Sequence, residues 1–369
     1  MAHGTNAEMM KTNNKKLILN LIRQDNYSRV DLAREMKLTK ATLSILTEEM
    51  LREGLIFEEA AGEDYSGVGR RPIYIRLREK ARYVIGIGLT RSGYHTGLFD
   101  LGGNAVRIER HKYCSDNADD NIKAMAEIVE RYKKIVPLEA LPGIGVAVPG
   151  PLDYKTGTIL NPPNFEVWHN CELSKKLSAL CGLPVRLENI ANAMAVAEQY
   201  FGCCRREKDF AYVAVDEGIG SGIVTNGRIY RSQRGYGNEL GHISIDINGK
   251  ECSCGNHGCL ERYAAIPEIL KGTGYESWKA VLDDNNESII RKEAEYLSCG
   301  IVSLLNLFDL GTIVLGGSIS EGGGKIAEII AKTVNGRAIS RHAVRVVMSE
   351  AGHERALAAA SIALSEFFF

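Results

Sequence analysis

The sequence of 369 residues lacks three features that mark whole classes of protein: long apolar runs, an export signal and a strong net charge. No uninterrupted apolar run approaches the ~18–20 residues that span a bilayer, which argues against a membrane helix. The polar start from Met1 to Lys16 has no hydrophobic signal core. We therefore expect a cytoplasmic protein without a membrane partner.

Cysteine and charge narrow the class further. Nine cysteines are an odd number in a chain without an export signal, so thiols or metal ligands are expected in place of a disulfide framework. The net charge of −1 hides a split, because residues 1–82 hold 15 Lys/Arg against 12 Asp/Glu, while the remainder holds 30 against 34. A small positive balance in the first segment permits DNA binding without establishing it.

The first 82 residues have the element order of a winged helix-turn-helix. An apolar stripe at helical spacing, a Ser-x-x-Asp capping box and a second apolar stripe predict three helices, followed by two alternating strands. The expected ranges are 15–24, 28–36 and about 39–53 for the helices, and 55–58 and 73–77 for the strands.

In such a module the third helix enters the major groove and the wing contacts the DNA backbone. The residues expected to contact DNA are small, hydrogen-bonding or basic: Thr39, Lys40, Thr42 and Ser44 on the helix, and Arg70 and Arg71 in the wing. A three-helix protein-interaction module is the alternative interpretation. The wing and its arginines, which come in the right order, favour DNA.

From residue 83 the pattern changes to alternating strands and helices. A strand, a Gly-rich turn and a second strand begin at Tyr83, and a similar opening recurs near Tyr212. This repeat predicts a duplicated α/β unit with a cleft between its halves. We expect the DNA-binding domain over 1–82, a first lobe over 83–198 with the C-terminal helix 354–369, and a second lobe over 199–353.

The strongest chemical signal is a group of three cysteines, Cys252, Cys254 and Cys259, in a Gly-rich loop that follows His242. Three thiolates and one imidazole make a closed tetrahedral zinc site, so we expect a structural Zn²⁺ that does not activate water. His257 is an alternative fourth ligand. Three reduced surface thiols are the alternative without a metal.

Further motifs lie along the α/β part. They include Val148-Pro-Gly-Pro151, Glu188-Asn-Ile-Ala-Asn192, Gly237-Asn-Glu-Leu-Gly-His242 and the cysteine loop that ends in Leu260-Glu261. With the winged module, these motifs make nearly the whole chain resemble the ROK family, which groups sugar-responsive repressors and sugar kinases. The resemblance implies an actin-like, ribonuclease H-like ATPase fold, with two α/β lobes around a sugar cleft.

The resemblance also implies which residues contact the sugar: Asn164, Asn189, Glu239, His242 and Glu261. These side chains supply the paired donors and acceptors that sugar hydroxyls need. His242 would bind zinc through one ring nitrogen and leave the other for a hydroxyl. Loop capping is the alternative role for the two asparagines, and a structural role beside the metal loop is the alternative for the two glutamates.

Three departures from the family's kinase pattern argue against catalysis. Ile190 occupies the position of the expected general base, and Gly88 stands where the first phosphate loop carries an acid. The second phosphate loop begins with Asp216 and Glu217, two carboxylates that oppose a polyphosphate. We therefore expect no catalytic residues and no sugar kinase activity.

The leading hypothesis is a sugar-responsive repressor that binds operator DNA as a homodimer or homotetramer, with a sugar or sugar phosphate in the cleft. A sugar kinase with a DNA-binding appendage is one alternative. A repressor controlled by a partner protein on the zinc side is another. The sequence leaves open ligands of the xylose, glucose or N-acetylglucosamine type, and it leaves open both induction and co-repression.

Overall fold

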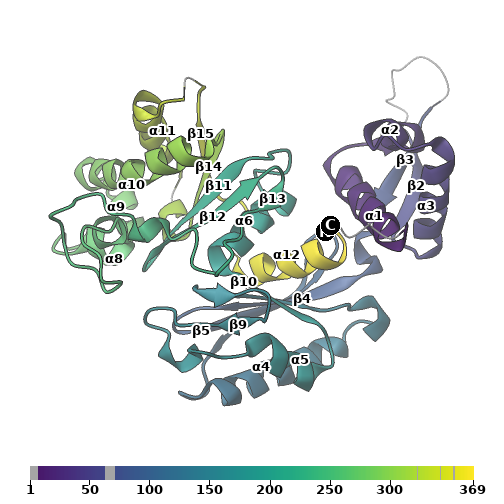
Figure 1. Ribbon diagram of the computed structural model, residues 1–369, viewed down its shortest axis with the longest axis horizontal. Coiled ribbons are helices and arrows are strands. Elements are labelled where there is room, and N and C mark those ends of the chain that lie inside the picture. Colours follow the sequence, from purple (N-terminus) through teal and green to yellow (C-terminus); the bar gives the residue numbers. More distant parts are fainter. Residues whose placement is uncertain (1–6, 63–70, 322, 341, 352–353) are drawn as a thin grey trace.

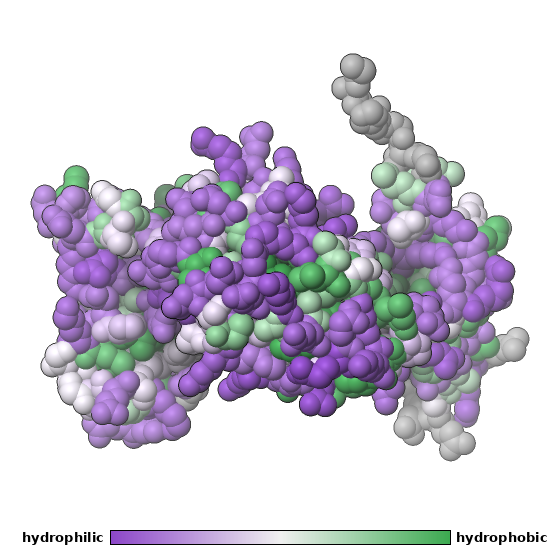
Figure 2. Space-filling model, turned by 90° about the horizontal axis from the view of Figure 1, so that it is seen from below, coloured by the Kyte–Doolittle hydropathy of each residue, from purple (hydrophilic) through white to green (hydrophobic). Residues whose placement is uncertain are grey.

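The computed structural model describes residues 7–62, 71–321, 323–340, 342–351 and 354–369. Two α/β lobes lie next to each other, and a smaller helical part lies beside the C-terminal helix (Figure 1). Within the described residues, no helix is both long and apolar enough to cross a membrane. The face in Figure 2 is mostly hydrophilic, with hydrophobic areas that polar residues interrupt.

The helical part is a three-helix unit with a small antiparallel sheet of order β1-β3-β2. Both predicted helix starts inside it are confirmed: Ser28 forms a capping box with Asp31, and Thr39 accepts a hydrogen bond from the backbone N–H of Thr42. Its elements are α1 (Ala7–Gln24), β1 (Tyr27–Ser28), α2 (Arg29–Glu35), α3 (Lys40–Arg52), β2 (Ile56–Ala60) and β3 (Ile73–Leu77).

Helix α1 begins at Ala7, well before the expected start near Lys15. Its first turns are polar and give no apolar stripe, but ion pairs attach them to α3. Lys11 lies 2.6 Å from the Glu49 carboxylate, and Lys15 lies 2.6 Å from that of Glu53. Such contacts between distant segments cannot be recognised from periodicity.

The first lobe contains a five-stranded sheet of order β10-β7-β4-β5-β6. Strands β4, β7 and β10 are parallel neighbours, and β5 and β6 extend the sheet antiparallel. The elements of this lobe are β4 (Tyr83–Leu89), β5 (Gly93–Asp100), β6 (Ala105–Lys112), α4 (Ala118–Lys133), β7 (Ile144–Val148), the hairpin β8 (Leu152–Asp153) and β9 (Thr158–Ile159), α5 (Leu173–Cys181) and β10 (Val185–Asn189).

The second lobe repeats this topology in a sheet of order β13-β12-β11-β14-β15. Its central strand again pairs antiparallel with the next strand and parallel with a later one, so the predicted duplication is confirmed. Its elements are β11 (Phe210–Val215), β12 (Ile219–Thr225), β13 (Arg228–Ile229), α7 (Glu261–Ala264), α8 (Ile266–Leu270), α9 (Trp278–Asp283), α10 (Glu287–Phe308), β14 (Thr312–Gly316), α11 (Lys325–Arg337) and β15 (Arg345–Met348).

Two alanine-rich helices, α6 (Ile190–Phe201) and α12 (Arg355–Phe367), lie between the two sheets (Figure 1). Helix α12 packs on β4 and β7, α6 packs on β11 and β12, and the two helices pack against each other. Small residues on both sides allow this close approach. A Cβ atom at Gly145 would lie 1.9 Å from the carbonyl oxygen of Ala359, and one at Gly222 would lie 2.3 Å from that of Ala191.

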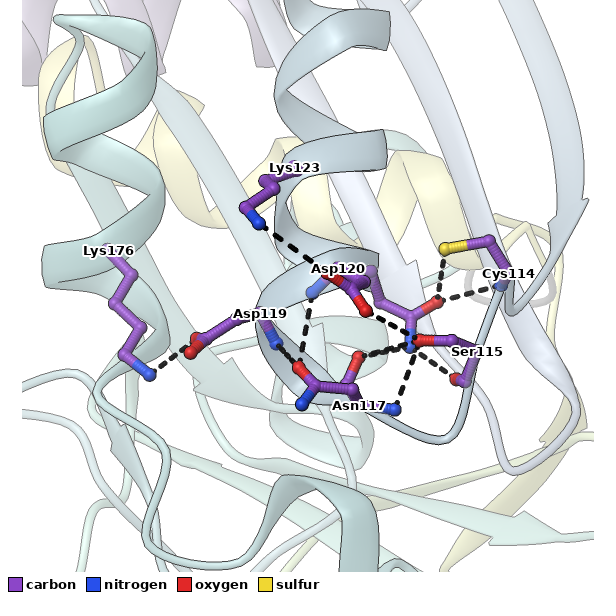
Figure 3. Close-up of polar contacts among 8 residues, drawn as sticks. Cys114, Ser115, Asn117, Asp119, Asp120, Lys123 and Lys176 are labelled. Atoms are coloured by element: carbon purple, nitrogen blue, oxygen red, sulfur yellow. Dashed lines mark hydrogen bonds and ion pairs between the residues drawn. The ribbon is translucent and has the colours of Figure 1, made fainter.

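The start of α4 shows how a local cap and an ion pair fix a helix of the first lobe (Figure 3). The side-chain oxygen of Asn117 accepts hydrogen bonds from the backbone N–H groups of Asp119 and Asp120, at 2.8 and 3.3 Å. Lys176 of α5 lies 2.6 Å from the Asp119 carboxylate. This cap starts α4 at Ala118.

The helical part shares a hydrophobic core with the first lobe and α12. The side chains of Ile18, Leu19 and Ile22 from α1 are buried in one cluster with residues of β4, β5 and α12. The α12 side of that cluster includes Ala360 and Leu364. A rearrangement of α12 therefore changes the packing of α1 directly.

We expect the Gly86→Ala substitution to destabilise the protein through this packing. A Cβ at Gly86 would lie 1.9 Å from the carbonyl oxygen of Ala356 and 2.6 Å from the backbone nitrogen of Ala360. Forcing such a contact costs about 1–3 kcal/mol or more. Urea unfolding should show a lower midpoint. Gly311→Ala is the control, because a Cβ there meets nothing within 4 Å; equal midpoints for the two variants would contradict this account.

Candidate functional site

A cavity of about 490 Å³ lies between the two lobes. The ends of β4 and β10 contribute Leu89 and Asn189 to its wall, and β11 and β12 contribute Ala214 and Ile219. Ligands of open α/β sheets bind beyond the carboxyl ends of parallel strands, which is where β4 and β10 reach this cavity.

All five residues that the sequence analysis proposed for sugar contact line this one cavity: Asn164, Asn189, Glu239, His242 and Glu261. They come from both lobes, two from the first and three from the second. The cavity therefore presents amide, carboxylate and imidazole groups from opposite walls. This arrangement suits a ligand with several hydroxyl groups, because each hydroxyl both donates and accepts.

On the first-lobe wall, backbone geometry holds the two asparagines in place. Asn189 is the N-cap of α6, and its side-chain oxygen accepts a hydrogen bond from the N–H of Ala191 at 2.8 Å. Its amide nitrogen faces Gly150, where an added Cβ would lie 2.6 Å from it. Asn164 adopts a left-handed conformation with φ of 56°. Capping and ligand contact are thus compatible at Asn189, since the cap uses only its oxygen.

On the second-lobe wall, Glu261 is held by the backbone. Its carboxylate accepts a hydrogen bond from the N–H of Ile219 at 2.9 Å. Glu239 is largely buried, and burial together with the negative charge of Glu261 raises the pKa of its carboxyl, although His242 opposes that rise. Two carboxyl groups near one imidazole give this wall a negative character.

His242 also belongs to a cluster with the three cysteines of the loop. The ligand atoms of His242, Cys252, Cys254 and Cys259 all lie within 4.8 Å of one another. Nδ1 of His242 lies 3.7 Å from the sulfur of Cys252, and the sulfurs of Cys254 and Cys259 are 3.6 Å apart. A tetrahedral zinc ion with Zn–S bonds of about 2.3 Å requires sulfur atoms about 3.8 Å apart.

The donor set therefore fits a metal ion. Burial and the neighbouring sulfurs raise the pKa of the Cys259 thiol, and a bound cation would favour its thiolate form. His242 is the histidine of the cluster, whereas His257 lies outside it. With three sulfurs and one nitrogen, the cluster could hold an ion through four protein ligands.

At the two segments that the sequence pattern predicts to correspond to phosphate loops, the cavity contains two ion pairs that sequence reasoning missed. Arg91, next to the end of β4, lies 3.2 Å from the Glu217 carboxylate. Arg355, the first residue of α12, lies 3.1 Å from the carboxylate of Asp216. Asp216 also accepts hydrogen bonds from the N–H and hydroxyl of Ser318, both at 2.7 Å. The arginines approach from α12 and the first lobe, and the acids belong to the second lobe.

The proposed DNA-contacting residues lie on α3 and in the wing. Thr39, Lys40 and Thr42 are exposed near the start of α3, and Ser44 is half-buried. Arg71 is exposed beside β3, whereas Arg70 lies outside the described residues. The start of α3 thus offers hydroxyl and ammonium groups to solvent. Their contact with DNA stays a prediction.

Comparisons with known proteins agree with this arrangement. The model of the ROK family matches residues 84–366. The xylose repressor of Bacillus subtilis (strain 168) is 29% identical over 97% of this chain and 96% of its own length.

Two solved structures match the fold. The crystal structure of a ROK family transcriptional regulator, a homolog of the E. coli MLC protein, has a TM-score of 0.81 at 24% identity and covers 97% of this chain and 98% of its own. The ROK hexokinase from Thermus thermophilus has a TM-score of 0.64 at 30% identity, and covers 77% of this chain and 99% of its own. The regulator thus matches nearly the whole chain. The hexokinase matches a smaller part, about as large as the two lobes together.

We expect the Cys254→Ser variant to lose bound metal, because a hydroxyl replaces one of four ligands. Elemental analysis of purified protein should find about one equivalent of a transition metal in the wild type and much less in the variant. Cys299→Ser on α10 is the matched control, since Cys299 lies outside the cluster. Equal metal content in Cys254→Ser and the wild type would refute the assignment.

Proposed function

This chain belongs to the ROK family, and we propose that it is a sugar-responsive transcriptional repressor whose winged helix-turn-helix binds operator DNA while its cleft binds the sugar. The conclusion depends chiefly on one observation: both helices between the lobes, α6 and α12, extend from the cleft to the DNA-binding part. With 12 and 13 residues, each spans about 18–20 Å.

Helix α12 makes this connection through its two ends. At its start, Arg355 pairs with Asp216 in the cleft. At its other end, the ammonium group of Lys16 in α1 donates hydrogen bonds to the carbonyl oxygens of Ser365 and Glu366. A cation on the last carbonyls of a helix is favourable, because the dipole is negative there.

Helix α6 makes a parallel connection. Its N-cap, Asn189, lines the cavity, and its last turn receives Arg23 of α1. The guanidinium donates a hydrogen bond to the carbonyl oxygen of Tyr200 and lies 4.8 and 4.1 Å from the ring centroids of Phe201 and Phe369. Burial lowers the pKa of Arg23 to about 10, which leaves it charged at neutral pH.

These contacts support a mechanism in which the sugar sets the angle between the lobes. A sugar that hydrogen-bonds to Asn189 on one wall and to Glu239 on the other favours one separation of the walls. Because α6 and α12 lie between the sheets, a change of that angle moves their ends against α1. Sugar and DNA then affect each other's affinity reciprocally.

The charges of the cavity favour a sugar without a phosphate group. Among the described residues that line it, the two arginines are engaged by Asp216 and Glu217. The carboxyl groups of Glu239 and Glu261 add further negative character. A phosphate would have to displace a carboxylate from its arginine, whereas neutral hydroxyls need no such exchange.

We further propose that the cluster holds a structural Zn²⁺. Four protein ligands leave no open position for water, so the ion would shape the wall and would not take part in chemistry. His242 and Ser253 of the cluster region both line the cavity. The metal loop thus positions part of the sugar-binding wall.

We propose as well that the lobes have no kinase activity. Ile190, at the expected position of the general base, lines the cavity with an aliphatic side chain that cannot accept a proton. The phosphate region is occupied by ion pairs in place of free cations. The similarity to the xylose repressor of Bacillus subtilis supports a regulator that acts on DNA. We propose that it acts in the cytoplasm, as a homodimer or homotetramer on a palindromic operator.

The coupling should be measurable by fluorescence anisotropy of the full-length protein on DNA that it selects from a randomised duplex pool. At fixed salt, one neutral sugar from a panel should change the DNA affinity about tenfold, which is about 1.4 kcal/mol of coupling. Its phosphate ester should act more weakly. In Arg23→Met, the sugar-induced change in DNA affinity should fall to less than twofold, while calorimetry shows an unaltered affinity for the sugar. Arg107→Met is the control, because Arg107 is exposed on β6. Unreduced coupling in Arg23→Met would contradict the helix mechanism.

The absence of kinase activity has its own test. A coupled ATP-consumption assay with the sugar panel should show no turnover above background for the wild type. Ile190→Asp should not restore much activity, because the ion pairs in the phosphate region remain. Turnover near one per second in the wild type, a typical lower value for kinases, would overturn the proposal.

A further inference from the structure

The outward face of α3 carries an apolar strip that the sequence analysis did not assign. The buried side of this helix consists of Leu43, Leu46, Thr47 and Met50. At 100° per residue, the positions diametrically opposite that side are 41, 45, 48 and 52. The centre of the exposed face is therefore formed by Ala41 and Ile45 in the first turns, while Thr42 and Ser44 lie toward its edges.

Ile45 is unusually exposed for a branched aliphatic side chain. Sixty per cent of its surface is open to solvent, and Ala41, one turn earlier, is also exposed. One turn later, the carboxylate of Glu48 forms an ion pair with Arg29 of α2 at 2.8 Å. The same guanidinium forms a second ion pair with Glu58, also at 2.8 Å. The charge after Ile45 is thus compensated within the protein, which leaves the apolar strip as the feature offered to a partner.

The surroundings of the strip indicate what that partner is. Thr39, Lys40 and Thr42 supply hydroxyl and ammonium groups on either side of the helix start, as phosphate contacts require. In helix-turn-helix proteins, the first residues of the recognition helix face base edges. The thymine 5-methyl group is the apolar feature of base edges in the major groove.

We propose that Ile45, together with Ala41, determines operator specificity by packing against thymine methyl groups in each half-site of the operator. This inference rests on the proposed function. The strip makes no hydrogen bonds to bases through its side chains. It therefore favours T·A over C·G, because an apolar side chain packs against the thymine methyl group and cannot hydrogen-bond to the polar edge of cytosine. The hydrogen-bonding residues at its margins position the helix.

The test removes the methyl group and the side chain separately. Duplexes are selected from a randomised pool by the full-length protein, and each thymine of the enriched site is replaced singly by uracil, which lacks only the 5-methyl group. Anisotropy then measures the affinity of the wild type, Ile45→Ala and Ile45→Val for each duplex. Ile339→Ala is the control, because Ile339 is 82% exposed in the second lobe.

In the wild type, uracil at one position per half-site should weaken DNA binding about fourfold, which is the effect expected when one buried methyl group is removed. The same replacement should have no effect on Ile45→Ala and an intermediate effect on Ile45→Val. Ile339→Ala should behave as the wild type. Since Ile45 is exposed, its substitution should leave the fold intact.

Three results would overturn the inference while leaving the repressor function standing. The first is strong DNA selection with no position sensitive to uracil. The second is a uracil sensitivity that persists in Ile45→Ala, and the third is a loss of self-association in that variant, which would make the strip a protein interface. Failure to enrich any DNA sequence would instead overturn the proposed function, and this inference with it.

Discussion

The close packing of two alanine-rich helices between two sheets is the constraint on which the rest of the molecule depends. Glycines in the strands, such as Gly145 and Gly222, leave room for the carbonyl groups of α12 and α6. Larger side chains at these positions would separate the lobes. The same packing brings the start of each helix to the cleft and its end to α1.

The cleft lies in an architecture shared with a ROK hexokinase, and ion pairs between the lobes cross it. The polar groups proposed to bind a sugar come from both lobes, so a sugar held by them would bridge the sheet that α12 covers and the sheet that α6 covers. Arg91 and Arg355 are engaged by acids of the opposite lobe, and these ion pairs link the two lobes across the cleft.

The DNA-binding part is continuous with the sensor in packing, although it precedes the sensor in sequence. Its α1 contributes Ile18 and Ile22 to a core shared with α12, and its Arg23 is enclosed by rings from α6 and the C-terminus. A shared core transmits displacement better than a flexible linker does, because packed interiors have discrete arrangements and low compressibility. This explains how a ligand far from α3 can alter DNA affinity.

The sequence by itself determined the helix-turn-helix, the duplicated α/β unit and the three cysteines of the candidate metal cluster. Caps such as Ser28, the recurring strand–glycine–strand openings and the cysteine spacing are local patterns, and the structure reproduces each of them. Only the tertiary structure decided that His242 and not His257 joins the cysteines, that Arg355 meets Asp216, and that Ile45 lies at the centre of the exposed face of α3. The first two features depend on distances between segments far apart in the chain, which spacing along the sequence does not encode. The exposure of Ile45 depends on whether another segment covers that face of α3, which helical periodicity alone does not decide.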